Sequence, residues 1–317
     1  MNFVPMKISV IICTYNPREE YLRRTLEGLQ KQTLARTEWE LLLIDNASQP
    51  PLAGRVDLTW HPGSRHLQEP KQGKLNAWLL GMREARGEVL VFVDDDNVLA
   101  PDYLEQALAV GEKWPFVGAW GGSVVPEFEV PVPAWVGAEI WRLTVVKVTD
   151  DVWSNLRDSF ATFPVGAGLC IRRQVAARYL EWCRQNKRSS ALDRSGKGLG
   201  GYGDMDLCQC AMDVGLGTGR STKLTLTHLI PQSRLTPDYF VRHAEGDAAS
   251  FLVYRAIRGL PVAPYARATW FNGLVWWLHC LLRRVPREQR QIHAAHCRGI
   301  RKGLELAEAI QAENLKL

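Results

Sequence analysis

The chain has 317 residues, of which 46% are hydrophobic and 23% are charged. This composition excludes a disordered chain, and the length suffices for one large α/β domain with an appendage. The net charge of +5 is modest, and the seven cysteines form no CxxC pair and no zinc spacing. We therefore expect free, buried thiols in a reducing compartment. Residues 1–7 lead directly into an apolar run without a signal-peptide pattern, so a cytoplasmic location is expected.

Apolar spacing in the first 113 residues alternates between the strand and the helix pattern. Strands are predicted over 8–14, 39–44 and 89–93, and helices over 22–29, 75–82 and from Pro101 onward. Residues 49–70 are predicted to be mostly loop, with a short strand near Leu58. The alternation of strands and helices favours a parallel sheet with right-handed crossovers.

The second half of the chain is less regular. Strands are expected over 114–125, 143–148 and 223–228, and a small-residue segment at 164–173 is expected to run into a further strand. Residues 186–203 are rich in Lys, Arg, Ser and Gly and are predicted to form a mobile loop. A helix is expected to open at Asp204.

Polar residues follow the carboxyl ends of three predicted strands. They are Thr14-Tyr15-Asn16, Asp45-Asn46 and Asp94-Asp95-Asp96. The carboxyl ends of parallel strands share one edge of a sheet, and open α/β sheets bind ligands there. We therefore expect the three loops to converge on one site.

The apolar run Val89–Val93 ends in three adjacent carboxylates, Asp94 to Asp96. Such a run suits a strand buried on both faces, whereas three adjacent acids cannot be buried without partners. A divalent cation that also holds substrate phosphates is the simplest partner, and a solvated acidic turn is the alternative. Because no glycine-rich loop is present to hold phosphate, Lys71 and Lys74 are candidates to meet the charge of a diphosphate.

Six segments within residues 7–246 carry a resemblance to a known family. They are ISVIICTYNPREEYLRRTLEGL, LLLIDNAS, GKLNAWLLGMREARGEVLVFVDDDNVLAPDYLE, GAGLCIRR, GYGDMDLCQCAMDVG and THLIPQSRL. In this order they resemble the GT-A-type, inverting, nucleotide-sugar-dependent glycosyltransferases of the large bacterial family two. The resemblance implies an α/β fold of the GT-A type, a mostly parallel Rossmann-like sheet flanked by helices, with a C-terminal helical appendage.

We expect the domains to divide accordingly. A GT-A catalytic domain is expected over 1–246, with a nucleotide-binding half at 1–113 and an acceptor half at 114–246. A helical appendage rich in Trp and Arg is expected over 247–317.

The resemblance also implies roles for the acidic residues and a metal cofactor. Asp96 and His228 are expected to bind Mn²⁺ or Mg²⁺, with Asp94 or Asp95 facing the ribose. The alternative for His228 is a purely structural role.

The resemblance makes Asp204 the general base that takes a proton from an acceptor hydroxyl. Capping of its helix is the alternative, and Asp206 competes for either role. The family usually carries Glu-Asp at this motif, whereas this chain has Gly203-Asp204. Any acceptor contact that the Glu makes in the family is therefore absent here.

The nucleotide-sugar donor is expected at residues from several segments: Thr14, Tyr15, Asn16, Asp45, Lys74, Asp94, Asp95, Gly166 and Arg234. Thr14 and Tyr15 are expected to flank the base, and Asp45 to accept a hydrogen bond from the uracil imide N–H. The structural alternative for Asp45 is an Asx turn.

The remaining donor residues have alternatives too. Lys74 and Arg234 are expected to meet phosphate, although either could be an ordinary surface cation. Gly166 and Gly168 would let the sugar approach closely, or would simply make a tight turn.

The C-terminal part contains Trp270–Leu282, which is too short and too polar to span a bilayer, followed by an arginine-rich stretch. Residues 283–302 contain seven Arg or Lys and one Glu. Two interpretations stay open: core of the appendage, or an in-plane membrane anchor that brings residues 270–302 to the inner face of the plasma membrane. Nucleic acid is not an expected partner, because no basic face interleaved with aromatic residues is present.

The leading hypothesis is an inverting glycosyltransferase that moves a sugar from a UDP-sugar to a hydroxyl of a glycan or a lipid-linked saccharide, in cell-surface polysaccharide synthesis. A polyprenyl-phosphate glycosyltransferase and an inactive glycan-binding relative are the alternatives. A nucleotidyltransferase is disfavoured, because that class carries a glycine-rich, basic signature after the first strand, where this chain has Cys13-Thr14-Tyr15-Asn16-Pro17.

Overall fold

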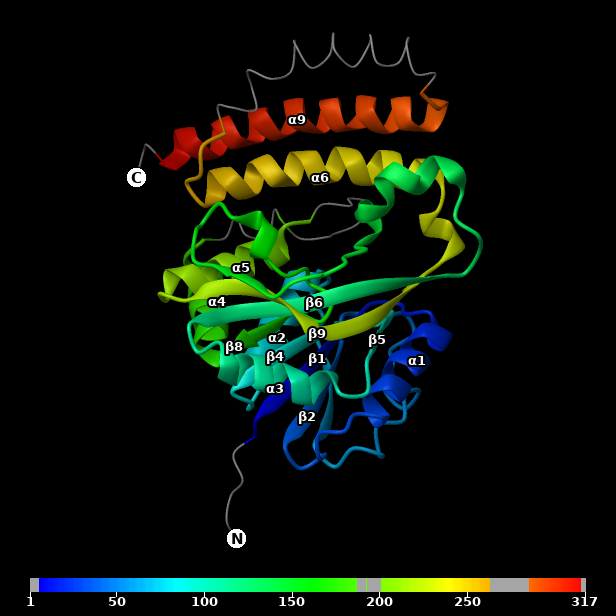
Figure 1. The fold of residues 1–317 in the computed structure, drawn as a ribbon, viewed down its shortest axis with the longest axis vertical. Helices are drawn as coiled ribbons and strands as arrows, with labels where there is room; N and C mark the ends of the chain where they lie inside the picture. The colour runs from blue at the N-terminus through cyan, green and yellow to red at the C-terminus, as the bar shows by residue number, and fades with distance from the viewer. Residues whose placement is uncertain (1–5, 187–191, 193–200, 263–284, 315–317) are drawn as a thin grey trace. The chain divides into compact units, whose positions relative to one another are not determined.

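The computed structural model describes residues 6–186, 192, 201–262 and 285–314 (Figure 1). The chain forms two compact units. The first comprises Met1–Glu127, Thr144–Asn186 and Leu207–Ile230, and the second comprises Phe128–Leu143, Lys187–Asp206 and Pro231–Leu317. Most of the expected mobile loop at 186–203 and the whole of Trp270–Leu282 lie outside the described residues.

The first unit contains the sheet. Its strands are β1 (Ile8–Thr14), β2 (Trp39–Asp45), β3 (Ser64–Gln68), β4 (Val89–Asp94), β5 (Asn97–Leu99), β6 (Val117–Phe128), β7 (Val152–Ser154), β8 (Cys170–Arg172) and β9 (Gly217–Ile230). They follow the order β3-β2-β1-β4-β8-β6-β9-β5, with β7 paired to β9. The helices with the sheet are α1 (Glu19–Gln30), α2 (Lys74–Glu84), α3 (Tyr103–Lys113), α4 (Arg173–Gln185) and the short η2 (Phe160–Thr162).

The predicted parallel sheet is confirmed for the first half of the chain. β1 pairs in parallel with β2 and with β4, and β2 pairs in parallel with β3. The run Val89–Val93 is at most 6% exposed, as expected for a strand covered on both faces. The later strands add antiparallel pairs, β4 with β8, β6 with β8 and β5 with β9.

Two local expectations were wrong, and one short strand was missed. The short strand lies at Ser64–Gln68 instead of near Leu58. This polar segment forms a strand because it pairs with β2 at the edge of the sheet. β5 was not expected; its three residues are specified by pairing with β9 and not by any apolar run. The strand expected over 143–148 is reduced to one bridge between Val124 and Val146.

The second unit is built around two long helices. α6 (Pro237–Ile257) and α9 (Arg287–Asn314) run side by side (Figure 1), and residues such as Leu252, Ala256 and Ala307 share an apolar cluster between them. The 3₁₀ helices η1 (Ala134–Leu143) and η4 (Gln232–Arg234) belong to this unit. α5 (Gly203–Asp213) begins in the second unit and continues into the first.

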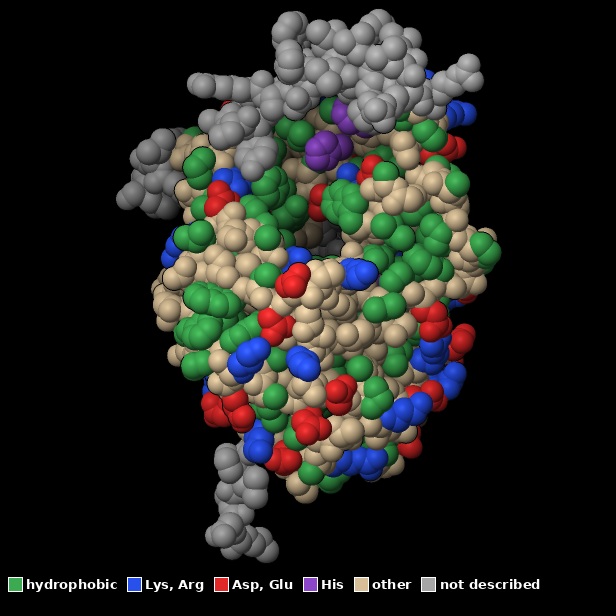
Figure 2. All heavy atoms as spheres, viewed as in Figure 1, with side chains coloured by type: hydrophobic (Ala, Val, Ile, Leu, Met, Phe, Trp, Pro, Cys, Tyr) green, Lys and Arg blue, Asp and Glu red, His purple; other side chains and the backbone are tan. Residues whose placement is uncertain are grey.

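The expected boundary at 246/247 lies inside α6, and the two compact units meet at other positions; the division into a catalytic domain and an appendage stays a prediction. Because α6 packs against α9, the whole of α6 belongs to the same compact unit as the C-terminal residues. On the face of the described residues drawn in Figure 2, acidic and basic side chains are interspersed. Of the cysteines in the described part of the chain, Cys170, Cys208 and Cys210 are buried as expected, whereas Cys13, Cys183 and Cys297 are partly exposed.

Candidate functional site

The carboxyl ends of β1, β2 and β4 lie next to one another, as the sequence predicts. Thr14 is in register with Asp45 across the β1–β2 pair, and Cys13 is in register with Asp94 across the β1–β4 pair. Three loops from distant parts of the sequence are therefore brought to one edge of the sheet, where ligands bind in open α/β folds.

Two acids of the triplet are paired with side chains from neighbouring elements. The ammonium of Lys74, the first residue of α2, lies 2.5 Å from Asp94 Oδ1. The hydroxyl of Thr14 donates to the carboxylate of Asp95. The chain thus balances part of its own negative charge, and Lys74, which was expected to reach phosphate, forms an ion pair with Asp94.

Asp96 lies beside His228, the other residue expected at a metal. His228 Nε2 is 3.5 Å from Asp96 Oδ2, and the residues are 4% and 7% exposed. The β5–β9 pair creates this proximity, because it places Asn97 opposite His228 and lets Leu229 N–H donate to the Asp96 carbonyl at 2.8 Å. Asn97 also donates to Asp96 Oδ1 at 3.0 Å.

The donor set of this pair fits a divalent cation held together with a nucleotide. A carboxylate oxygen and an imidazole nitrogen are both ligands that Mn²⁺ accepts, and Mg²⁺ is commonly bound by one or two carboxylates plus substrate phosphates. Across the described ranges, no group of three or more His, Cys, Asp or Glu side chains is arranged to hold a metal. Two protein donors leave coordination positions for phosphate oxygens and water.

Asp45 holds the loop that follows β2. It is fully buried, and its two oxygens accept hydrogen bonds from Ser48 N–H at 3.0 Å and from Leu52 N–H at 2.9 Å. Burial alone would raise the pKa of Asp45, but the hydrogen bonds from Leu52 and Ser48 outweigh it and lower this pKa below its usual value. These contacts are those of the structural alternative, and a bond to uracil stays a prediction.

The loops after β1 and β2 are fastened to each other. Asn16, with a φ of 47°, donates its N–H to Ser48 Oγ at 3.0 Å. Its side-chain oxygen accepts the Gln49 N–H at 2.7 Å. The ring of Tyr15 is left 47% exposed, which suits stacking on a flat base. Ser48 was missed in the sequence, although its place in the polar run after β2 was a usable signal.

Gly168 is required by packing inside the protein. Its φ is +70°, and a Cβ built there would lie 2.4 Å from the hydroxyl of Tyr103, which itself donates to the Gly168 carbonyl at 2.7 Å. This matches the tight-turn alternative. Gly166 lies two residues earlier in the same turn and is partly exposed, so close approach of a sugar there stays a prediction.

Asp204 and Asp206 both lie in the first turn of α5, and the structure separates them. Asp206 is fully buried, and its carboxylate is 2.5 Å from Arg258 Nε. A carboxylate locked in this way has no access to an acceptor hydroxyl. Asp204 is partly exposed and accepts the Met205 N–H at 2.9 Å. Both acids, like Arg234 in η4, belong to the second unit.

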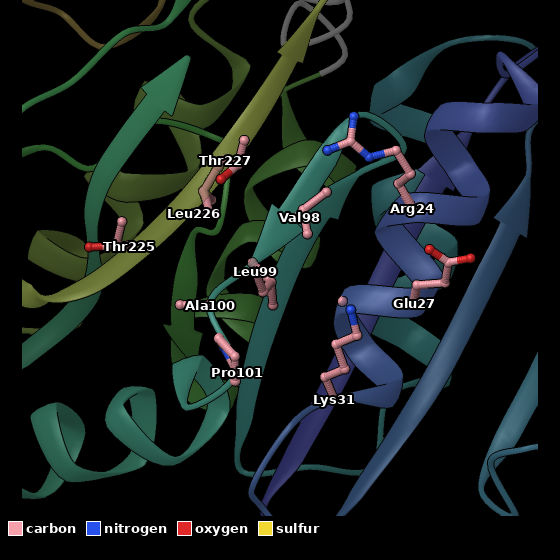
Figure 3. A pocket seen from close by; sticks show the side chains of 11 residues that line it. Arg24, Glu27, Lys31, Val98, Leu99, Ala100, Pro101, Thr225, Leu226 and Thr227 are labelled. Atoms are coloured by element: carbon pink, nitrogen blue, oxygen red, sulfur yellow. The ribbon is translucent and has the colours of Figure 1, made fainter. Parts of the chain in front are cut away.

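A separate surface pocket of about 330 Å³ lies between α1 and the β5–β9 pair (Figure 3). It is lined by Arg24, Glu27, Gly28, Lys31, Val98, Leu99, Ala100, Pro101, Thr225, Leu226 and Thr227. Arg24 at its rim forms two hydrogen bonds to Glu127, at 2.6 and 2.9 Å. No residue predicted for the donor or the metal lines this pocket.

The C-terminal expectations concern residues 270–302. The Trp270–Leu282 segment is outside the described residues, and residues 287–302 form part of α9. Among the helices that the structure describes, none is long and apolar enough to cross a membrane.

The family model and the relatives that match this chain are all glycosyltransferases. Residues 9–164 match the family model "Glycosyl transferase family 2". The chain is 27% identical over 143 residues to the glucosyl-dolichyl phosphate glucuronosyltransferase of Haloferax volcanii, which is 44% of either chain. It is 30% identical over 107 residues to the poly(ribitol-phosphate) beta-N-acetylglucosaminyltransferase TarS of Staphylococcus aureus, 33% of this chain and 18% of that protein. The matched stretch therefore spans less than half the length of these relatives.

The fold comparison extends over more of the chain. A crystal structure of S. aureus TarS 1-349 superposes with a TM-score of 0.51 at 14% identity, covering 97% of this chain and 92% of that one. At this identity the likeness concerns the fold alone, and that fold is the GT-A arrangement of a central sheet flanked by helices. Residues 9–164 therefore carry a glycosyltransferase family 2 domain, and the chain has a GT-A fold.

Proposed function

We propose that this glycosyltransferase is metal-dependent and inverting, and that it moves a sugar from a UDP-sugar to a hydroxyl of a glycan or a lipid-linked saccharide in cell-surface polysaccharide synthesis. The observation that carries the proposal is the buried pair of Asp96 and His228 next to the converging strand ends. A carboxylate and an imidazole at the rim of a parallel sheet supply what a metal-bound diphosphate needs.

The choice of donor draws on the solved relative. S. aureus TarS has been crystallised in complex with UDP-GlcNAc, in a structure that superposes on this chain with a TM-score of 0.51. In this chain Tyr15 is exposed for stacking on a base, and Lys74 is close enough to the acids to exchange Asp94 for a phosphate. The two curated relatives are named for a dolichyl-phosphate-linked sugar and a ribitol-phosphate polymer as acceptors, which supports a cell-surface glycan or a lipid-linked saccharide.

The residues of the chain take separate parts in the proposed reaction. Thr14, Tyr15 and Asn16 border the nucleoside, and Asp94 or Asp95 faces the ribose. Asp96 and His228 would hold Mn²⁺ or Mg²⁺, which when bound neutralises negative charge on the diphosphate.

Asp204 is proposed as the general base. It accepts the proton of the acceptor hydroxyl as that oxygen attacks the anomeric carbon and the bond to the diphosphate breaks, and this single displacement inverts the anomeric centre. The burial of Asp206 against Arg258 favours Asp204 over its neighbour.

Contact with a membrane is part of the proposal. Residues 270–302 combine Trp with Arg, which suits peripheral binding at an anionic surface. Sedimentation of the full chain with phosphatidylcholine vesicles, with and without phosphatidylglycerol, tests it. Equal pelleting with both lipids would remove the electrostatic part of the proposal.

The central test uses two variants and two measurements. A thermal-shift screen of nucleotide sugars with and without Mn²⁺ identifies the donor, and release of the nucleoside diphosphate then measures turnover. Asp96→Ala is expected to abolish turnover and the Mn²⁺-dependent shift while the ligand-free melting temperature stays near that of the wild type. Turnover by Asp96→Ala at saturating Mn²⁺ would refute the metal role.

Asp204→Asn is expected to keep UDP binding and to lose turnover, because the amide cannot take a proton at neutral pH. Loss of UDP affinity instead would move Asp204 into the donor site. Turnover that survives in this variant would point to a lipid-phosphate acceptor, which needs less help from a base. A wild-type chain that binds glycans but releases no nucleoside diphosphate from any donor would indicate the inactive relative.

A further inference from the structure

The first turn of α5 is held by one face of α6, within the second unit. Tyr202, the residue before α5, interacts with Asp247, Phe251 and Tyr254 of α6, and Asp206 in the turn pairs with Arg258, the residue that follows α6. The spacing of these four partners, at four, three and four residues, places them on the same side of the helix. The turn that carries Asp204 is thus fastened to a single continuous surface.

The C-terminal end of the turn is fixed by a buried ion pair. Arg258 Nε lies 2.5 Å from Asp206 Oδ1, and the two side chains are 3% and 0% exposed. A second guanidinium nitrogen donates to the backbone carbonyl of Asp206. Replacing such a pair by apolar residues is often neutral or stabilising, so stability alone does not explain it. What the pair supplies is a fixed orientation of both the side chain and the backbone at this residue.

The N-terminal end of the turn is fixed by an aromatic side chain. Tyr202 has a φ of 76°, in the left-handed region that residues other than glycine rarely occupy. Its ring stacks on Tyr254 with centroids 5.8 Å apart and lies 5.4 Å from the ring of Phe251. Burial and then the nearby carboxylate of Asp247 raise the pKa of its hydroxyl. Strained backbone of this kind persists when surrounding contacts determine it, and it gathers at functional sites.

The anchor for Tyr202 is itself held in place. Arg142 of η1 lies with NH1 3.7 Å from Asp247 Oδ2, and its Nε donates to Glu139 Oε2 at 2.7 Å. The side chain of Arg142 is only 6% exposed. Asp247 therefore has a buried cation on one side and the tyrosine hydroxyl on the other.

We propose that Tyr202 and Arg258 are positioning residues for Asp204. They fix the turn on both sides of this carboxylate, so that it meets the acceptor hydroxyl in one orientation. The inference rests on the proposed role of Asp204 as the base and adds the residues through which that role is maintained. Positioning matters because a misplacement of about 1 Å can cost about 10²-fold in rate.

Two conservative variants test the proposal, each with hydrogen exchange and kinetics. Arg258→Lys keeps the charge and loses the two-point contact, and Tyr202→Phe keeps the ring and loses the hydroxyl. Both are expected to speed amide exchange at residues 203–208, measured by mass spectrometry. With UDP-GlcNAc as the donor, kcat is expected to fall by about 10- to 100-fold while KM for the donor stays unchanged.

Arg65→Lys is the matched control, because Arg65 also pairs with a nearly buried acid, Glu40 at 3.1 Å, in the first unit. It is expected to leave kcat and the exchange at 203–208 as in the wild type. Wild-type exchange and kcat in both test variants would overturn the proposal, and so would an equal loss of kcat in the control. If Arg258→Lys does not fold, Tyr202→Phe decides. Asp204→Asn distinguishes failure of the proposed base role from failure of the positioning proposal. If Asp204 is not the base, Asp204→Asn still turns over, whereas the two test variants still show faster amide exchange at residues 203–208.

Discussion

The role of Asp45 separates two interpretations of the nucleotide site, and Asp45→Asn distinguishes them. Each carboxylate oxygen accepts one loop N–H, from Ser48 and from Leu52, and the residue has no exposed surface. The amide of asparagine offers only one acceptor oxygen, so one of these buried donors loses its partner. An unsatisfied buried group costs about 1–3 kcal/mol, and we expect the free energy of unfolding to fall by about 2 kcal/mol.

The pH dependence follows from the lowered pKa of Asp45. A carboxyl whose pKa is lower in the folded state stabilises the fold above its unfolded pKa of about 4, and this stabilisation is lost as the pH falls through the folded pKa. The variant lacks this titrating group. In urea denaturation at a series of pH values, the stability difference between wild type and variant is therefore largest near neutral pH and shrinks below about pH 4.

Nucleotide binding gives the decisive measurement. If Asp45 acts by holding the loop, Asp45→Asn weakens UDP and CDP by the same factor in calorimetry, because both bases meet the same displaced Tyr15. Asp57→Asn is the control: Asp57 also accepts a loop N–H, from Thr59 at 2.9 Å, but on an exposed surface. A loss confined to UDP would refute this reasoning and would establish the bond to the uracil imide.

Three further changes test other parts of the structure. Tyr15→Ser is expected to weaken UDP and CDP by about 1–3 kcal/mol in calorimetry, the range found for stacking on a base, without changing the melting temperature; unchanged affinity would place the base elsewhere. Gly168→Ala is expected to lower the free energy of unfolding by about 1–3 kcal/mol in urea, because it combines a left-handed φ with a clash against Tyr103; a stability equal to wild type would contradict the turn geometry. Glu40→Gln is expected to cost about 2 kcal/mol, because an amide NH2 replaces the buried oxygen that accepts from Arg65 at 3.1 Å; the affinity for UDP is expected to be unchanged, because Glu40 lies at the opposite end of β2 from the proposed site.

Periodicity and order along the chain were sufficient to predict the strands around the site. β1, β2 and β4 are continuous apolar runs followed at once by polar residues, so their type, their parallel pairing and the edge that they share all follow from local pattern. The convergence of Thr14, Asp45 and Asp94 needed no information beyond this.

What the sequence could not provide are contacts made between segments far apart. β5 has three residues and no pattern of its own, yet its pairing with β9 is what sets His228 beside Asp96. Likewise, Asp204 and Asp206 are equivalent in a helical pattern, and only the arginine at the end of α6, 52 residues after Asp206, tells them apart. Pairing partners of this kind depend on the tertiary fold and leave no local signal.

The ion pair of Lys74 with Asp94 has a consequence for how the protein meets its donor. An enzyme that carries an internal counterion does not need nucleotide or metal to relieve the repulsion among its acids, so it can persist intact between turnovers. In the proposed reaction, an incoming diphosphate would draw Lys74 away from Asp94, so that the same ammonium group would neutralise the carboxylate in the empty site and the phosphate in the filled one.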